Sequence, residues 1–555
     1  MAPKPSLFRL VLSQSLVTED VLQHSYPGKG TAEEPYVVDF IPDDARNPML
    51  LSQPVKWFIT LIMAFGTLSV SMASAGISGA VIQIEEGLNV STEVATLTVT
   101  LFVLGFAIGP MTWAPMSELW GRQWLYLFTL GLCTLFGGCS IASENIQTLL
   151  VLRFFSGTFG ASSIVNAAGV IADIFPPRER GLAITVYCSA PFLGPTLGPI
   201  CGGFLGQYAG WRWVDALSVI FSGVMWIMGV IFVPETYTPY LLVRRAAKLS
   251  KLTGNVYKSK LEVDKGHKTV GEVFKVAIVR PWVLLIFEPI VLMLAIYAAV
   301  VYGILYMQFA AFPIIFEEQR HWSQGISGLS FLGVGVGQIL AVFIYLVFDR
   351  MYKKKAAAAG GRLPPEARLE PALLGCILLP IGLFWFAWTC FLSIHWIVPI
   401  IGTVFFGLGQ VLLFISLMNY TIDAYTVFAA SSLAANAIFR ALFGFAFPMF
   451  TTQMFHNLGY NWGASIPAFL SLVCAPFPLL FKIYGARIRA ACKYATEADK
   501  IMAAIMGQMA AAAKKEDPEK NEPLATETPK DVEERAHDSE DTAHESSPSV
   551  ESQKV

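Results

Sequence analysis

The chain has 555 residues, of which 54% are hydrophobic and only 14% charged, and its mean hydropathy is +0.55. Because soluble proteins carry about 25% charged residues, this composition excludes a soluble globular protein and indicates an integral membrane protein. The formal net charge is −2, and no basic, aromatic-rich surface segment points to nucleic acid as a partner.

Twelve apolar runs follow a polar N-terminal segment, and each is long enough to cross ~30 Å of hydrocarbon as a helix. A polar stretch after the sixth run divides them six and six. The sequence therefore predicts an all-α membrane protein with twelve transmembrane helices. The runs lie near residues 57–80, 94–115, 124–143, 147–174, 181–206, 213–233, 282–310, 327–348, 371–392, 396–422, 431–455 and 463–484.

This pattern predicts five consecutive parts. Polar composition with little periodicity is typical of disorder, and it marks both ends of the chain. The parts are a disordered cytosolic tail (1–54), a six-helix bundle (55–234), a basic cytosolic loop (235–281), a second six-helix bundle (282–485), and a cytosolic tail that is acidic and disordered towards its end (486–555).

The basic residues in the loops predict the orientation in the bilayer. With both termini in the cytosol, the inner loops carry nineteen Lys and Arg residues, whereas the outer loops carry Arg212 and Arg320. The sequon Asn89-Val90-Ser91 then lies in an outer loop, where Asn89 is a candidate glycosylation site.

The loop between the second and third runs, residues 109–122, reads GPMTWAPMSELWGR. It must lie at the face of the bilayer because a turn between two spanning helices needs water. Glu118 and Arg122 are four residues apart, so they would face each other on one helical turn. The spacing alone fits equally well a solvated turn that only follows membrane topology.

The fourth run contains Arg153, which a helix would place about 9 Å below the outer end of that run. An arginine at such a depth costs up to roughly 3 kcal/mol on insertion scales. We therefore expect Arg153 to face a cavity or an acid. The alternative is a side chain that extends to the outer headgroups.

The fifth run contains SAPFLGPTLGPICGG, residues 189–203, with four glycines and three prolines. Such a segment would destabilise a soluble helix, whereas in a bilayer glycine allows close helix contact. Ordinary small-residue packing explains one pair of glycines but poorly explains the whole run. The sequence predicts a closely packed seam formed by Gly194, Pro195, Gly198, Pro199, Gly202 and Gly203.

The seventh run contains Glu288, about six residues from its start. A carboxylate there must be protonated, paired or hydrated. Tyr302 and Tyr306 follow on one helical face, so they are candidates for a substrate cavity.

Three further polar residues lie towards the inner ends of later runs. Asp423 closes the tenth run, and Asn436 and Arg440 lie four residues apart near the inner end of the eleventh. They are candidates for a substrate cavity or an inner gate. Alternatively, Asp423 and Arg440 form an ion pair that only holds the closed state.

Several of these motifs resemble those of the major facilitator superfamily, and of its fungal twelve-helix drug:proton antiporter family in particular. Gly109-x8-Glu118-x2-Gly121-Arg122 is similar to the loop between helices 2 and 3, whose acid and arginine act as a cytoplasmic latch. Most members have aspartate at the position of Glu118. The resemblance covers about residues 43–490 and implies a latch formed by Gly109, Glu118, Gly121 and Arg122.

Two more motifs carry the resemblance. The segment Arg153–Gly157 resembles the fourth-helix motif, whose arginine lines the central cavity and is implicated in proton transfer. The segment Gly194–Gly203 resembles the fifth-helix motif of proton antiporters, which uptake carriers typically lack. The resemblance thus implies proton coupling, with Glu288 as the candidate proton carrier and Arg153 modulating it.

The resemblance implies a secondary transporter with two pseudo-symmetric halves and alternating access. Its reaction would be proton-coupled export of a small organic molecule, such as a drug, toxin, secondary metabolite, organic acid or polyamine, across the plasma membrane. The expected partners are this substrate, protons and the lipid bilayer, and the expected state is a monomer. No cofactor is expected, and ATP is not implied because no G-x-x-x-x-G-K-[ST] motif occurs.

Three alternatives belong to other functional classes or directions. An enzyme would need a nucleophile or metal motif, and neither G-x-S-x-G nor H-E-x-x-H is present. A non-transporting sensor on the same fold would usually need a long signalling tail. A proton-coupled uptake carrier is disfavoured by the fifth-helix motif.

Overall fold

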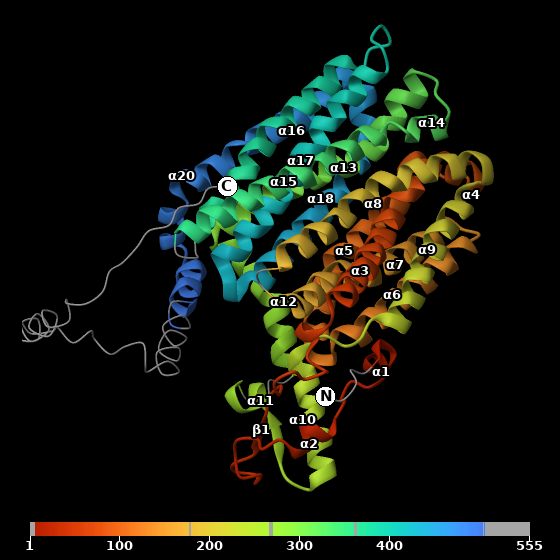
Figure 1. Cartoon of the computed structure of the whole chain (residues 1–555). Helices are drawn as coiled ribbons and strands as arrows, with labels where there is room; N and C mark the ends of the chain where they lie inside the picture. The colour runs from red at the N-terminus through yellow and green to blue at the C-terminus, as the bar shows by residue number, and fades with distance from the viewer. Residues whose placement is uncertain (1–5, 177–178, 266–269, 360–362, 503, 505–555) are drawn as a thin grey trace, which may run out of the picture. The chain divides into compact units, whose positions relative to one another are not determined.

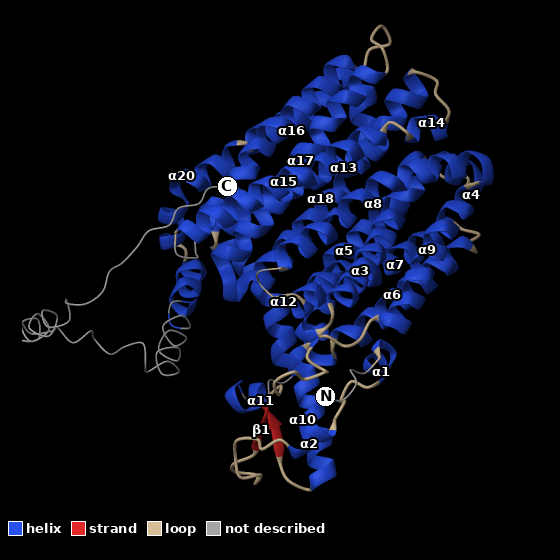
Figure 2. Cartoon of the chain, in the orientation of Figure 1, coloured by secondary structure: helices blue, strands red, loops and turns tan. Residues whose placement is uncertain are grey.

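The computed structural model describes residues 6–176, 179–265, 270–359, 363–502 and 504, mostly as helices (Figures 1 and 2). The described residues as far as Ala498 belong to one compact unit, and the few described residues from Asp499 on belong to another. The acidic end of the predicted C-terminal tail lies outside the described residues. The predicted helical membrane class is confirmed for the compact unit.

The first bundle contains the helices that the first six apolar runs predict. A proline in the first turn begins α3 and a capping serine precedes α5, whereas glycines with positive φ, Gly121 and Gly210, end α5 and α8. The elements are α3 (Gln53–Gly76), η2 (Ile77–Ala80), α4 (Val81–Leu88), α5 (Thr92–Trp120), α6 (Arg122–Ile141), α7 (Ile146–Ile174), α8 (Arg180–Ala209) and α9 (Trp211–Phe232).

The second bundle is formed by the later apolar runs, and Figure 1 shows its green-to-blue helices beside the red-to-yellow helices of the first. Its elements are α12 (Val270–Phe287), α13 (Pro289–Pro313), the π-helical turn η3 (Ile314–Gln319), α14 (Gln324–Gly328), α15 (Phe331–Ala358), η4 (Pro365–Leu369), α16 (Glu370–Thr389), α17 (Ile397–Tyr425), η5 (Thr426–Phe428), α18 (Ala429–Leu458), α19 (Tyr460–Cys474) and α20 (Pro476–Ala491).

Ten stretches of the described chain are long and apolar enough to cross a membrane. One of them, Ile397–Leu458, has 62 residues, about three times the length that a single crossing needs. It turns at Thr426, whose φ is 22°, and so contains two crossings, α17 and α18. With α8, which is rich in glycine and proline, the described residues supply the twelve crossings that the sequence predicts.

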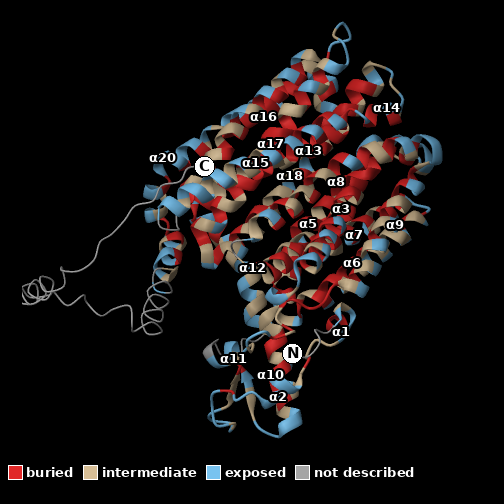
Figure 3. Cartoon of the chain, viewed as in Figure 1, coloured by how far each residue is buried: buried red, intermediate tan, exposed pale blue. Residues whose placement is uncertain are grey.

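Apolar side chains face outward over the spanning helices, where pale-blue exposed positions occur along the bundles in Figure 3. Leu135, Phe343 and Val473 are 58%, 63% and 69% exposed. In water such a surface would be costly, whereas hydrocarbon chains cover it without penalty. The exposed apolar surface is therefore the lipid-facing side of the bundles.

The N-terminal segment is folded, which differs from the predicted disordered tail. Its elements are α1 (Leu7–Leu12), α2 (Glu19–Gln23), β1 (Tyr36–Val38) and η1 (Pro48–Leu50), and the central loop contributes α10 (Thr238–Thr253), β2 (Tyr257–Ser259) and α11 (Lys260–Lys265). Strands β1 and β2 pair in parallel, with Tyr36 opposite Tyr257. The prediction of disorder is therefore wrong for residues 6–52. Their order depends on pairing with the central loop some 200 residues later, which local composition does not reveal.

A buried ion pair fastens these two segments. Asp44 accepts hydrogen bonds from Arg245 of α10, and both side chains are at most 3% exposed. Arg46 donates to the carbonyl oxygen of Glu235, 2.9 Å away. Burial lowers the pKa of Arg46 to about 10, so this arginine remains charged at neutral pH. We call these paired segments, residues 6–52 and 238–263, the paired layer.

We expect Asp44→Ala to loosen the paired layer. The substitution leaves the guanidinium of Arg245 buried without its carboxylate, which costs about 3–5 kcal/mol. Trypsin should then cleave after the exposed Lys258 faster than in the unsubstituted protein. Glu34→Ala is the control, because Lys29 and Glu34 form an exposed pair (75% and 55% exposed) that contributes little. Equal cleavage rates for the two variants would contradict this role of Asp44.

Candidate functional site

The loop between α5 and α6 holds the first group of predicted residues. Gly109 of α5 packs directly against Ala161 of α7, so a side chain there would clash. Trp113 donates to the carbonyl oxygen of Thr158 at 2.7 Å and fastens the same pair of helices. The close approach predicted for Gly109 thus has a definite partner, α7.

Arg122 binds a different acid from the one that its spacing suggests. Its Nε lies 3.2 Å from Asp173 of α7, its Nη1 donates to Ser117 at 2.9 Å, and its guanidinium lies 5.0 Å from the Tyr237 ring centre. Glu118 is exposed and forms no ion pair with any residue that the structure describes. The expected contact between Glu118 and Arg122 is therefore wrong, because Gly121 interrupts the helix between them.

Glu235 is a functional residue that the sequence analysis missed. It is fully buried and accepts hydrogen bonds from the backbone amides of Arg122 and Gln123, at 3.0 and 3.1 Å. A carboxylate at a helix N-terminus is favourable because unpaired amides and the positive end of the helix dipole meet it. Gly121 has φ +92°, and a side chain on it would collide with Glu235. Its position in the segment Pro234–Tyr237, directly after the sixth apolar run, was the feature of the sequence that could have pointed to it.

We expect Arg122→Ala to lower stability and transport strongly, and Glu118→Gln to change both little. Hydrogen bonds to charged partners contribute about 1.5–3 kcal/mol, and Arg122 loses two of them. An exposed carboxylate contributes about 0–1 kcal/mol. Thermal unfolding of the purified variants measures the difference. A larger effect of Glu118→Gln than of Arg122→Ala would contradict this expectation and support the predicted latch role of Glu118.

The second bundle repeats the arrangement around Arg122. Arg368 of η4 lies 2.8 Å from Asp423 at the end of α17 and 3.9 Å from Asp349 of α15, with its guanidinium 3.8 Å from the Tyr352 ring centre. In each half, an arginine at or just before the start of the third helix thus pairs with an acid near the end of the fourth. The alternative pairing of Asp423 with Arg440 is wrong, because Asp423 forms its ion pair with Arg368.

Arg153 faces an acid, as one of the two expectations stated. Its Nη1 lies 2.9 Å from Asp215 of α9, and both side chains are at most 4% exposed. Its other nitrogens donate to the carbonyl oxygens of Thr98 and Ala73, at 3.0 and 2.9 Å. Ser140 donates to the second oxygen of Asp215 at 2.9 Å. Five helices of the first bundle therefore converge on one buried ion pair, and Asp215 is a residue that the sequence analysis missed.

The glycine–proline run of α8 forms a seam mainly with α3. Gly194, Gly198 and Gly202 approach the backbone of residues 71–76 so closely that a side chain on any of them would collide with it. Gly203 instead approaches Gln324 of α14, in the other half, and Pro199 approaches Gly328 of the same helix. Pro195 lies within α8 and is buried. One run therefore touches both halves.

Glu288 does not lie within a spanning helix, contrary to the sequence-based placement. The following Pro289 disfavours helical backbone at Glu288, so α12 ends at Phe287 and α13 begins at Pro289. The carboxylate is fully buried at this break and accepts from the Tyr425 hydroxyl and the Tyr494 amide, both at 2.8 Å. It joins three chain segments where α12 and α13, the end of α17 and the segment after α20 meet.

Tyr302 and Tyr306 of α13 lie where the halves meet. The Tyr306 hydroxyl is 2.8 Å from Ser74 Oγ of α3, and the two tyrosine hydroxyls are 3.5 Å apart. The Arg440 guanidinium of α18 lies 5.0 Å from the Tyr302 ring centre. Arg440 lies eleven residues after the start of α18, about 16 Å along the helix, and so about three turns from that end. Asn436 is buried one turn before it.

The two halves also meet where the end of α8 approaches α14. Gln207 of α8 accepts from the Gly325 amide of α14 at 3.0 Å, and the side chains of Gln83 and Gln324 are hydrogen-bonded to each other. Asn89 is exposed near this end, in the left-handed conformation that ends α4. Hydrogen bonds thus connect the two halves at the end where α8 and α14 meet.

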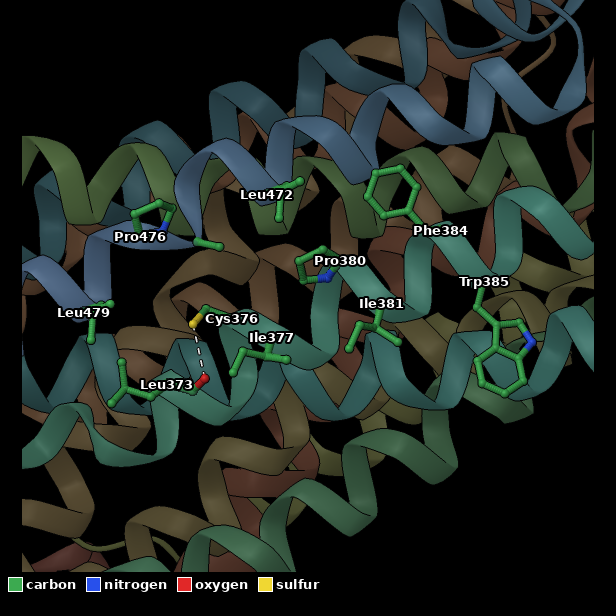
Figure 4. Close-up of a pocket in the computed structure, with 11 residues that line it drawn as sticks. Leu373, Cys376, Ile377, Pro380, Ile381, Phe384, Trp385, Leu472, Pro476 and Leu479 are labelled. Carbon is green, nitrogen blue, oxygen red and sulfur yellow. Dashed lines mark hydrogen bonds between the residues drawn. The ribbon is translucent and has the colours of Figure 1, made fainter.

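Two cavities differ in their position. The larger, about 890 Å³, has eleven lining residues from α16, α19, α20 and the turn between the last two, among them Pro380, Phe384 and Pro476 (Figure 4). It lies beside the break between α19 and α20 and contains none of the predicted site residues. The smaller, about 150 Å³, lies between α8, α15 and α17, where the halves meet, and Gln338 lines it.

Comparisons with known proteins agree with this geometry. A family model described as Major Facilitator Superfamily matches residues 63–448. The chain is 53% identical to the MFS-type efflux pump MFS2 of Trichophyton rubrum over 90% of this chain and 84% of that protein. It is 51% identical to the major facilitator superfamily multidrug transporter mdrA of Aspergillus fumigatus, over 93% of this chain and 85% of that protein.

A solved structure matches as well. The proton:xylose symporter XylE, bound to 6-bromo-6-deoxy-D-glucose, has a TM-score of 0.56 and 18% identity, covering 78% of this chain and 97% of that chain. At this identity the likeness shows the fold alone. The predicted resemblance and fold class are confirmed.

Proposed function

The chain belongs to the major facilitator superfamily, a family of transporters and not of enzymes, and on that premise we propose that it exports small organic molecules, such as drugs or secondary metabolites, in exchange for protons. The observation that carries the proposal is the buried Arg153–Asp215 pair in a chain about half identical to proteins named as efflux pumps and multidrug transporters. The glycine–proline run of α8 supports the outward direction.

Alternating access requires contacts between the halves that form and break. Ser74–Tyr306 at mid-depth, Thr196–Gln338 between α8 and α15, and Gln207–Gly325 at the outer end are such contacts. Each is a single hydrogen bond, which contributes only about 0.5–1.5 kcal/mol, so each can be exchanged at low cost. The ion pairs of Arg122 and Arg368 lie within one half each and would move with it.

Proton coupling needs a carboxylate that changes its protonation during the cycle. Asp215 is the stronger candidate, because protonation would release Arg153 from its only acidic partner among the described residues. Glu288, the candidate from the sequence, binds a tyrosine hydroxyl and a backbone amide at a chain break, which favours a structural role. Both carboxylates remain in the proposal as candidate proton carriers, and Arg153 is the residue whose contacts change when the proton binds.

The remaining parts of the proposal concern the setting. The protein is proposed to act as a monomer in the plasma membrane, with both termini in the cytosol and with Asn89 glycosylated on the outer side. The exposed position of Asn89 supports its modification. The boundaries of the two bundles are proposed at residues 55–234 and 282–485.

Whole cells test the proposal. Cells that express the chain should retain less of an azole drug or an aromatic acid than cells that do not, and a protonophore should abolish the difference. Export that survives the protonophore, or retention that expression never lowers across such a panel, would overturn it. Asp215→Asn and Glu288→Gln then separate the two carboxylates. The export that the protonophore abolishes should already be lost in the first variant and should be kept in the second.

A further inference from the structure

Arg440 contrasts with five of the largely buried arginines that the structure describes, because it has no acid beside it, whereas other arginines without an ion pair, such as Arg46, donate to backbone carbonyl oxygens. Five arginines whose side chains are at most 23% exposed each bind a carboxylate of another element. They are Arg122 with Asp173, Arg153 with Asp215, Arg245 with Asp44, Arg368 with Asp423, and Arg489 with Glu366. Across the described ranges, no carboxylate lies within 4.0 Å of Arg440.

Aromatic rings surround Arg440 in place of an acid. Its guanidinium lies 4.5 Å from the ring centre of Phe414 of α17 and 5.0 Å from that of Tyr302 of α13. The titratable side chains nearest to it are Tyr187, Tyr302 and Tyr306. Its Nε is buried and has no hydrogen-bond partner among the residues that the structure describes. The charge is thus only partly compensated, by ring faces.

Such a charge is expensive at mid-depth in a membrane unless an anion or water meets it. An arginine stays protonated under all physiological conditions, so deprotonation cannot relieve the cost. The planar guanidinium binds carboxylates with two parallel hydrogen bonds, and its Nε is one of the donors that such a bond uses. We infer that Arg440 is the anchor for the anionic group of an organic acid that the protein transports.

A place for the apolar body of this acid lies next to Phe414. The ring of Phe414 contacts that of Phe192 of α8, with centres 4.8 Å apart. Phe192 lines the cavity of about 150 Å³ between the halves, and a cavity of this size accommodates a benzene-sized group. Gln338, which is 2% exposed and lines the same cavity, has an amide nitrogen without a partner. This nitrogen can donate to a polar atom on the ring.

The same geometry disfavours polycations. A polyamine needs carboxylates, and the interior acids of the described chain are already bound, Asp173, Asp215 and Asp423 to arginines and Glu288 to Tyr425. Moving a polyamine past Arg440 would bring like charges together. The site therefore selects ring-bearing monoanions from the substrate classes that the proposed function allows, and in this respect it rests on that proposed function.

Three probes with one skeleton test the inference: 4-phenylbutyrate, its neutral amide 4-phenylbutyramide, and the cation 4-phenylbutylamine. Binding to the full-length protein in nanodiscs is measured by calorimetry, independently of transport. We expect the carboxylate to bind at least about tenfold more tightly than the amide, and the amine not to compete. Equal binding of carboxylate and amide, preferred binding of the amine, or no binding of the carboxylate at millimolar concentration would overturn the inference.

Two variants assign the preference to Arg440. Arg440→Gln should abolish the difference between carboxylate and amide, whereas Arg440→Lys should keep part of it. The ratio of the two affinities is measured within each variant, and amide binding reports that the variant is folded. If Arg440→Gln does not fold, the Arg440→Lys ratio decides: an unchanged ratio contradicts bidentate anchoring. Proton-driven export of the amide and amine as well as of the acid would refute the inference and leave the proposed function intact. Binding of the acid without any export would instead refute the proposed function and leave the anion site intact.

Discussion

Arg153→Ala is expected to give a protein that reaches the membrane poorly and transports nothing. The substitution removes the only cation that meets Asp215 among the described residues and leaves a carboxylate that is 3% exposed with Ser140 alone. Removing one partner of a buried ion pair costs about 3–5 kcal/mol, which is a large part of the stability of an ordinary domain. Fluorescence-detected size exclusion of the tagged protein measures the loss of folded material.

The double variant Arg153→Met/Asp215→Leu separates folding from transport. Replacing both charges by apolar side chains of similar size is often neutral for stability, because no buried charge is left. We therefore expect folded protein at levels near those of the unsubstituted chain, still without proton-dependent export. A double variant that exports normally would show that the pair only supports the fold and would refute its role in coupling.

Gly202→Ala is expected to lower both stability and transport. A methyl group at Gly202 collides with the backbone oxygen of Gly76, which cannot turn away as a side chain can. Overpacking of this kind typically costs about 1–3 kcal/mol. Because the proposed cycle moves α8 relative to α14 of the other half, and the shape of α8 depends on its packing against α3, we expect transport to fall by more than the loss of folded protein explains. Initial export rates per folded molecule measure this.

Gly223→Ala is the matched control for the seam. Gly223 lies in the spanning helix α9, and a methyl group there would meet only Thr134 Cγ2 at 3.5 Å, an ordinary contact. Alanine favours the helix over glycine by up to about 1 kcal/mol, so this variant should be as stable as the unsubstituted protein or slightly more so. If both glycine variants behave alike, the close approach at Gly202 has no functional meaning.

The sequence was sufficient for the spans and for the family, because each depends on local composition or on a short motif. It was insufficient for the partners of the charged residues. Spacing suggested Glu118 for Arg122, and a shared place towards the inner ends of two runs suggested Asp423 for Arg440. The structure instead pairs Arg122 with Asp173 and Asp423 with Arg368. These partners lie 51 and 55 residues apart, so only the packing of helices brings them together.

Two other differences have local physical causes. A run of apolar residues on both sides hid the break at Glu288, although Pro289 marked it. The N-terminal segment lacks a periodic apolar pattern because its stability comes from β1–β2 pairing and from Asp44–Arg245, both with partners in the central loop. Asp215 was missed for a third reason, since one acid near the end of an apolar run resembles an interfacial residue.

Transport by the purified protein in proteoliposomes tests the central claim most directly. The interior is made more acidic than the outside by one pH unit, and uptake of labelled 4-phenylbutyrate is compared between vesicles holding the protein, vesicles holding Asp215→Asn, and empty vesicles. Since one pH unit corresponds to about 1.4 kcal/mol, exchange for one proton should drive about tenfold accumulation. The account predicts uptake that requires the gradient and Asp215, and no gradient-dependent uptake beyond that of the empty vesicles would contradict it.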